Sequence, residues 1–292
     1  AMNRRTFLAA GSAAVASSAL ALNPTRKLRV GVIGHTGRGN YGHGLDTVWL
    51  KLPDTEIVAV ADAQVNALAN ARKRLPVPQG FADYQEMLRK VKLDIVAVCP
   101  RHADQHHDMA LAATKSGVRG IYIEKPFMRT PAEVDSLATA CKKQGTKIAI
   151  AHRNRWHPML EVIDQFIADG HLGKILEIRG RGKGDRRGGG EDLWVLGSHV
   201  LNLIHYFGGK PLTCSARMFQ DGQPVVGTHV KDGNEGLGPL AGNALHARYE
   251  MERGMIAYFD SIANDGTQNH GFGLHLIGSK GILAIRNDRQ PF

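Results

Sequence analysis

The chain has 292 residues, of which 43% are hydrophobic and 22% charged, and its formal net charge at pH 7 is +10. This composition is that of a folded protein of about two domains, and it excludes disordered, fibrous and multi-span membrane classes. The positive charge is compatible with nucleic acid, an anionic surface or an anionic substrate, and does not choose among them. The 34 glycines are typical of α/β enzymes whose glycines form phosphate-binding turns.

The N-terminal residues resemble a twin-arginine export signal. Arg4-Arg5 precede a short apolar stretch, rich in alanine and serine, that contains an A-x-A cleavage site at residues 19–21. The stretch is too weakly apolar for a membrane anchor, which needs about 20 strongly apolar residues. We expect residues 1–21 to be a signal removed on export to the periplasm, with Ala1 a remnant of cloning. The alternative is a basic disordered tail.

The first buried strand, Leu28 to Ile33, runs directly into a glycine-rich turn. Such a turn lets backbone N–H groups and a helix N-terminus approach a pyrophosphate. The G-x-G-x-x-G pattern fits in two registers, one from Gly37 and one from Gly34 with Thr36 at the middle glycine. We prefer the register from Gly34, because it starts at the end of the strand. The cofactor-binding residues expected here are Gly34, Thr36, Gly37, Arg38 and Gly39.

The second strand, Glu56 to Ala61, ends in Asp62. An acid at this place in a dinucleotide-binding unit hydrogen-bonds the adenosine ribose. The interval from Gly34 exceeds the usual ~20 residues, which we attribute to a longer first helix and a loop. A carboxylate here repels a 2′-phosphate, so NAD is expected, although the nearby Arg38 leaves NADP open.

Strands and helices then alternate, which predicts a parallel doubly wound sheet with ligands at the carboxyl ends of its strands. Pro100, Glu124 and Lys125 each follow a strand and are expected to contact the cofactor. Residues 130–133 form a capping box with proline at the first helical position, so Lys125 lies in a short rigid link. A lysine beside a buried glutamate relays protons or holds a carbonyl oxygen. The alternative is a structural Glu-Lys ion pair.

The run from Leu28 to Gly209 resembles the glucose-fructose oxidoreductase and inositol dehydrogenase family, often called Gfo/Idh/MocA, and Glu124-Lys125-Pro126 is its most specific motif. The resemblance implies a Rossmann NAD(P)-binding domain over residues 27–151, in which Lys125 contacts the substrate hydroxyl and cofactor ribose. It also implies a substrate-binding and oligomerisation domain over residues 152–292, and we expect a C-terminal segment to be missing from it. Recurrent strands after residue 209 predict a largely antiparallel open sheet there.

The segment ending in His199 matches the family pattern D-x-G-x-H-x-x-D, with Val195 and Asn202 in place of the two aspartates. His199 is the expected general base, because its ordinary pKa near 6.5 suits proton transfer at neutral pH. The alternative is a structural histidine. Either Asp192 or Glu191 replaces the lost aspartate, or the reaction is altered.

Further candidates for substrate contact come from a helix, from the acidic residues before it, and from one segment with a family counterpart. On a helix starting near Ser198, a polar stripe faces a cleft, and a segment similar to Arg-x-x-x-Pro follows the last strand of the first domain. Five basic residues between positions 179 and 190 either bind an anionic group or lie in a mobile loop. The candidate substrate residues are Arg155, His157, Asp192, Asn202 and Tyr206.

The combined pattern predicts an exported NAD(P)-dependent oxidoreductase that transfers hydride to or from a sugar, polyol or sugar derivative, with Lys125 and His199 handling the hydroxyl proton. Two alternatives stay open. One is a redox-neutral NAD-dependent glycosidase or lyase with tightly bound cofactor, and the other is an inactive sugar-binding relative. No metal, nucleic acid or stable membrane anchor is expected, and a homo-oligomer is expected from the resemblance.

Overall fold

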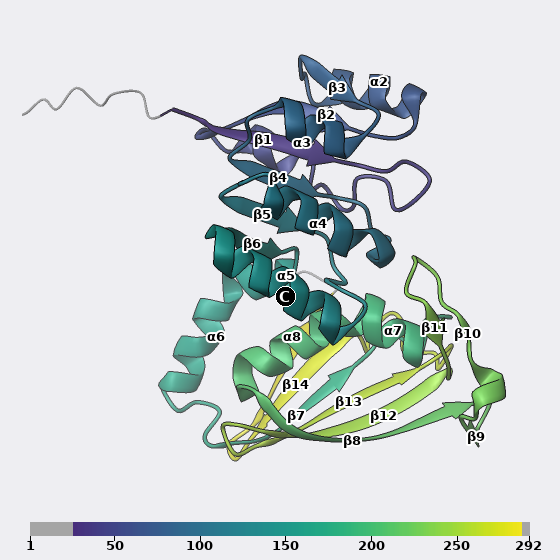
Figure 1. Cartoon of the computed structure of the whole chain (residues 1–292). Helices are drawn as coiled ribbons and strands as arrows, with labels where there is room; N and C mark the ends of the chain where they lie inside the picture. Colours follow the sequence, from purple (N-terminus) through teal and green to yellow (C-terminus); the bar gives the residue numbers. More distant parts are fainter. Residues whose placement is uncertain (1–25, 288–292) are drawn as a thin grey trace, which may run out of the picture.

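The computed structural model of the chain describes residues 26–287, so the predicted export signal lies outside the described residues. Figure 1 shows two sheets, with helices of both parts packed between them. The first sheet has six strands in the order β3-β2-β1-β4-β5-β6, all paired in parallel. The strands are β1 (Leu28–Ile33), β2 (Thr55–Ala61), β3 (Gln79–Phe81), β4 (Ile95–Val98), β5 (Gly120–Ile123) and β6 (Lys147–Ile150).

The first sheet is the predicted doubly wound one, and its central strands are apolar on both faces. Val30, Val32 and Ile33 of β1 are fully buried, as expected of a parallel strand covered by helices on both sides. None of the helices within residues 26–287 is long and apolar enough to cross a membrane. The helical segments of this part are η1 (Val48–Lys51), α2 (Val65–Arg74), α3 (Tyr84–Lys90), η2 (Ala103–Gln105), α4 (His106–Lys115) and α5 (Pro131–Gln144).

The long first helix that we expected between Gly34 and β2 is absent. Turns cover residues 41–47, and only the 3-10 helix η1 follows them. Gly42 and Gly44 have φ values of 62° and 86°, in the left-handed region that interrupts a helix. A Cβ atom on Gly42 would lie 2.7 Å from the Cys99 carbonyl oxygen. The close approach of a neighbouring strand therefore requires glycine where a helix would otherwise run.

The second sheet has seven strands in the order β15-β14-β7-β13-β12-β8-β9 and is antiparallel except for the β7–β13 pair. Helix α8 packs on one face through Val200, Leu203 and Phe207, while β8 is largely exposed. Its strands are β7 (Ile175–Arg181), β8 (Pro211–Gln220), β9 (Gln223–Pro224), β12 (Ala244–Met251), β13 (Ile256–Ile262), β14 (Gly273–Gly278) and β15 (Ile282–Arg286). The remaining segments are η3 (Arg153–Trp156), α6 (Met159–Ala168), α7 (Gly190–Val195), α8 (Gly197–Gly208), η4 (Gly227–His229), β10 (Lys231–Asp232) and β11 (Pro239–Leu240).

The predicted helix cap at Thr130 is present, and it fixes the link between Lys125 and α5. The Glu133 backbone N–H donates to Thr130 Oγ1 over 3.2 Å. The Glu133 carboxylate reaches back and accepts from the Arg129 backbone N–H over 2.8 Å. One of the unpaired donors of the helix and the N–H of the residue before the cap are thereby satisfied.

We expect Thr130→Ala to lower the free energy of unfolding by about 1 kcal/mol, because it removes the acceptor for one of these donors. Urea denaturation measures the change. Thr139→Ala, on an exposed position in the middle of the same helix, should change stability by less than about 0.5 kcal/mol. Equal losses in the two variants would show that the cap is not the source.

Candidate functional site

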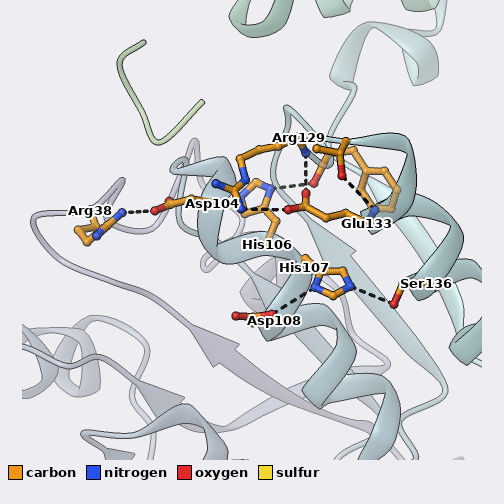
Figure 2. A network of polar contacts seen from close by, with 10 residues as sticks. Arg38, Asp104, His106, His107, Asp108, Arg129, Glu133 and Ser136 are labelled. Carbon is orange, nitrogen blue, oxygen red and sulfur yellow. Dashed lines mark hydrogen bonds and ion pairs between the residues drawn. The ribbon is translucent and has the colours of Figure 1, made fainter. Parts of the chain in front are cut away.

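The glycine-rich loop closes against the segment that follows β4. The Arg101 backbone N–H donates to the Gly39 carbonyl oxygen over 3.3 Å. A Cβ atom on Gly39 would overlap the Arg101 nitrogen, so only glycine allows this approach. Arg38 forms an ion pair with Asp104 across the same boundary (Figure 2). Two predicted cofactor-binding residues thus bind the β4 segment in this structure.

The Asp62 carboxylate binds Thr36, the residue that replaces the middle glycine of the pattern. Its side chain is 1% exposed and accepts from the Thr36 hydroxyl over 2.7 Å and from the Thr36 backbone N–H over 3.2 Å. The Gln64 N–H donates to the same carboxylate over 2.9 Å. Thr36 is therefore compatible with this loop because Asp62 binds its hydroxyl. Contact between Asp62 and a ribose stays a prediction.

A cavity of about 330 Å³ lies at the carboxyl ends of β1, β2 and β4 and fits the adenosine end of a dinucleotide. Asp62 and Gly34 are in its wall, and no lysine or arginine lines it, which disfavours a 2′-phosphate. Gly37 has a φ of 85° and open space where a side chain would be, and its backbone N–H donates to Asn40 Oδ1 over 3.0 Å. The residues of this cavity therefore fit NAD better than NADP.

A buried histidine ties together the two segments that carry Pro100 and Lys125. His106 is inaccessible to solvent, and its Nε2 atom lies 2.7 Å from the Pro100 carbonyl oxygen. Its Nδ1 atom lies 3.0 Å from the Phe127 carbonyl oxygen. Figure 2 shows His106 beside the Arg38–Asp104 pair. The Pro100 carbonyl is thus used to fix the β4 segment against the β5 segment.

Lys125 reaches from the first sheet to the second part of the molecule. Its residue is 6% exposed, and its Nζ atom donates to the Val195 carbonyl oxygen over 2.8 Å. Burial lowers the pKa of Lys125, and the Glu124 carboxylate opposes this lowering. The acceptor is thus the backbone of Val195, the residue that stands where the family pattern has aspartate.

Glu124 is bound within the protein on both of its oxygens. Its side chain is 1% exposed, and it accepts from the Lys125 backbone N–H over 2.6 Å. The second oxygen lies 2.6 Å from His43 Nδ1. Glu124 therefore anchors the segment that carries Lys125, and its predicted contact with the cofactor stays a prediction.

Two neutral histidines stand near Lys125. The rings of His152 and His199 meet edge to face with centroids 5.7 Å apart, and the Nδ1 atom of each is buried without a hydrogen-bond partner. Burial, with the Lys125 charge next in importance, lowers the pKa of His199 to about 3 and that of His152 to about 4. Our reason for choosing His199 as the general base is therefore wrong, since a group of pKa about 3 is a weak base at neutral pH. His152 was not among the predicted site residues, although it follows β6 at the same edge of the sheet.

Neither acidic residue of α7 replaces the aspartate lost at Val195. Asp192 is fully buried and accepts from Ser261 Oγ over 2.6 Å, and its Oδ1 and the Nδ1 of His199 are each without a hydrogen-bond partner. Burial raises the pKa of Asp192. Glu191 accepts from Asn234 Nδ2 over 2.8 Å. The hypothesis that one of them pairs with His199 is corrected by these contacts.

The predicted polar stripe on α8 divides into two parts. Asn202 lines a cavity of about 750 Å³ together with His152, and its Oδ1 atom is buried without a partner. Tyr206 instead contacts Asp164 of α6 through its hydroxyl, and the Arg155 guanidinium lies 4.4 Å from its ring centroid. These residues belong to the contact with α6.

His157 also takes part in local structure. Its Nδ1 atom accepts from the Met159 backbone N–H over 3.2 Å at the start of α6. Of the five predicted substrate residues, only Asn202 therefore lies with the histidine pair.

The basic loop before α7 is packed and largely ion-paired. Gly189 needs glycine, because a Cβ atom there would overlap the Gly242 carbonyl oxygen, and the Gly190 N–H donates to that oxygen over 3.1 Å. The ion pairs are Arg179–Glu177, Arg181–Asp265 and Arg187–Asp185. Three of the five basic residues are thus neutralised inside this part of the chain, which contradicts a mobile loop.

Comparison with known proteins fits this geometry. Residues 28–152 match the GFO_IDH_MocA family, an oxidoreductase family with an NAD-binding Rossmann fold. Residues 28–152, less than half of the chain, are therefore similar to this family. NAD is the cofactor of such a domain, and the fit of the 330 Å³ cavity agrees with it.

Individual relatives are distant from this chain. D-apiose dehydrogenase of Paraburkholderia graminis is 28% identical over 43% of this chain and 33% of its own length. Myo-inositol 2-dehydrogenase of Thermotoga maritima is 26% identical over 90% of this chain and 76% of its own. The chain thus spans only a third of the first relative and three quarters of the second. The structure of the WlbA dehydrogenase from Bordetella pertussis, in complex with NADH and UDP-GlcNAcA, superposes with a TM-score of 0.71 at 17% identity, covering 89% of this chain and 78% of that one. That similarity extends the shared fold to both sheets.

We expect the stability of the chain to fall as the pH drops below about 6.5. The pKa values of His152 and His199 are depressed in the folded state, so the unfolded chain binds protons that the folded chain does not. The contribution of the two histidines to the free energy of unfolding is fully present above pH 6.5 and decreases toward about pH 4. At pH 5 the decrease is about 2 kcal/mol per imidazole. Urea denaturation at pH 7 and pH 5 measures the loss.

The double variant His152→Gln, His199→Gln should lose less stability than the wild type between these two pH values. His270→Gln removes an exposed imidazole and serves as the matched control. The interpretation fails if the double variant keeps the full pH dependence of the wild type.

Proposed function

We propose that this protein is an NAD-dependent oxidoreductase whose substrate is a sugar, polyol or sugar derivative. The observation that carries the proposal is the buried Lys125 ammonium, which lies between the carboxyl edge of the NAD-binding sheet and α7. NAD, when bound, supplies the acceptor or donor of a hydride. The chain itself must then hold the substrate hydroxyl and move its proton.

Lys125 suits that task by its charge and by its free donors. An ammonium group has three N–H donors, and the Val195 carbonyl takes one of them. The others are available to a substrate oxygen. Because burial lowers the pKa of Lys125, this group exchanges a proton with a hydroxyl more readily than an exposed lysine does. We assign the proton-transfer role to Lys125.

The two histidines serve as neutral hydrogen-bonding groups in this proposal. At neutral pH, His152 and His199 are uncharged, and each has a buried ring nitrogen without a partner. An unpaired buried nitrogen is costly unless a ligand completes its hydrogen bonding. Substrate hydroxyl groups have the chemistry to do so. The relatives named D-apiose dehydrogenase and myo-inositol 2-dehydrogenase also support a polyhydroxylated substrate.

The experiment that tests this function compares NAD binding and turnover in the wild type and in Lys125→Met. We expect NAD still to bind, with a smaller loss of affinity because Lys125 is also a predicted contact of the cofactor ribose, while formation of NADH from a panel of sugars and polyols falls by about 100-fold or more in the variant. Lys115→Met replaces an exposed lysine and should leave both unchanged. Undiminished turnover in Lys125→Met would sink the proposal. Stoichiometric NAD in freshly purified, undialysed protein would instead favour the redox-neutral glycosidase or lyase.

We also propose that the protein is exported through the twin-arginine route and works in the periplasm as a homo-oligomer. The support for export is the sequence of residues 1–21, with its paired arginines and A-x-A site. The support for an oligomer is the exposed face of the second sheet.

A fusion of residues 1–30 to a reporter tests the export signal. Replacing Arg4-Arg5 by lysines should retain the reporter in the cytoplasm, and replacing Arg26 by lysine should not. Export that survives loss of both paired arginines would exclude this route.

A further inference from the structure

A β-hairpin joins the second part of the molecule to the first one beside the reaction site. Strands β10 and β11 pair antiparallel, and the Gly233 N–H donates to the Gly238 carbonyl oxygen over 2.8 Å to close the tip. Figure 1 shows the hairpin rising beside α7 toward the first sheet's helices. The Ala103 backbone N–H donates to the Glu235 carbonyl oxygen over 3.0 Å. The tip, residues 233–238, is thus bound to the segment that follows β4.

Three contacts of different kinds fix this tip in place. Leu237 is 7% exposed and packs with Ala103 and Val195. Asn234 donates to Glu191, as described above. Gly236 has a φ of 69°, and a Cβ atom there would overlap the Asp104 carboxylate. Because Val195 also accepts the Lys125 hydrogen bond, the hairpin packs against the residue that holds Lys125.

Glu235 is the unusual residue of the tip. Its φ is 55°, a left-handed conformation that a residue with a side chain rarely adopts and that costs of order 1 kcal/mol. Its side chain is half-buried, and within residues 26–287 no hydrogen bond or ion pair engages its carboxylate. The left-handed backbone at Glu235 therefore costs conformational energy and keeps a carboxylate without a hydrogen bond at the junction of the two parts. Backbone strain of this kind is concentrated at functional sites.

We propose that Glu235 is a positioning residue that supplies, from the hairpin tip, the second carboxylate that stabilises the Lys125 ammonium. The acids of α7 have other partners, because one oxygen of Asp192 accepts from Ser261 and Glu191 accepts from Asn234. Glu235 acts through Lys125, and the inference rests on the proposed function only for what Lys125 then does to a substrate.

The charges around Lys125 support this assignment. Burial lowers the pKa of Lys125; the carboxylates of Glu124 and Glu235 raise it, and the guanidinium groups of Arg187 and Arg101 lower it. The two neighbouring histidines are neutral at pH 7. Since Glu124 is already bound to His43 and to a backbone N–H, Glu235 is the carboxylate in this set that is free to respond to Lys125.

The titration of Lys125 tests the proposal directly. The chain is produced with ¹³C,¹⁵N-labelled lysine, the Lys125 side-chain resonance is identified by its absence in Lys125→Arg, and its pKa is measured by NMR. We expect Glu235→Gln to lower the pKa of Lys125 by about half a unit or more, because an opposite charge near it is lost. Glu235→Asp keeps the charge and should restore most of the shift. Asp232→Asn, at the exposed base of the same hairpin, should leave the pKa unchanged.

The result that overturns the proposal is an unchanged Lys125 titration in Glu235→Gln, or an equal shift in Asp232→Asn. Neither measurement needs turnover or a known substrate. A wild-type chain that binds no NAD would therefore refute the proposed function while the titration still decides on Glu235. Circular dichroism of each variant separates an altered charge from a lost fold.

Discussion

One buried ammonium group holds the two parts of this molecule in relation to each other. Lys125 comes from the first sheet, and the oxygen that accepts its hydrogen bond comes from α7. A buried charge is costly unless hydrogen bonds and opposite charges compensate it. Glu124 of the same segment provides part of that compensation, and the Val195 carbonyl adds to it only when the two parts are in contact. The position of the Lys125 ammonium group therefore depends on the packing of the two parts.

The same charge contributes to the state of the histidines. Burial is the main reason that His152 and His199 stay neutral, and the nearby Lys125 charge adds to it by repelling a second positive charge. The site then has one ammonium group and two neutral imidazoles. Such a set favours uncharged hydroxyl groups as ligands, because hydroxyls donate and accept hydrogen bonds without adding charge. The electrostatics and the polyhydroxylated character of the proposed substrate thus agree.

Local patterns in the sequence predict much of this molecule. The apolar strands of the first sheet and the cap at Thr130 depend on residues close together in the chain, so period and spacing reveal them. The missing first helix was not predictable in that way, because Gly42 is required by the approach of Cys99 from another strand. Asp192 is similar, since its partner Ser261 comes from β13. His152 had a usable signal, its place directly after β6, and spacing drew attention to Arg155 and His157 instead.

The positive charges of Lys125 and Arg38, at the two ends of the site, are compensated in different ways. The difference affects how an anionic ligand binds. At the reaction end, a fixed ammonium group is compensated from three elements and has no reason to move. At the cofactor end, the Arg38 side chain is about half exposed and forms an ion pair with Asp104. An anionic group at the glycine loop would compete with Asp104 for that guanidinium, so that one surface ion pair would replace another at a small net cost. The charge of Lys125 is thus compensated inside the protein, whereas that of Arg38 is compensated by a surface ion pair that an anionic ligand can replace.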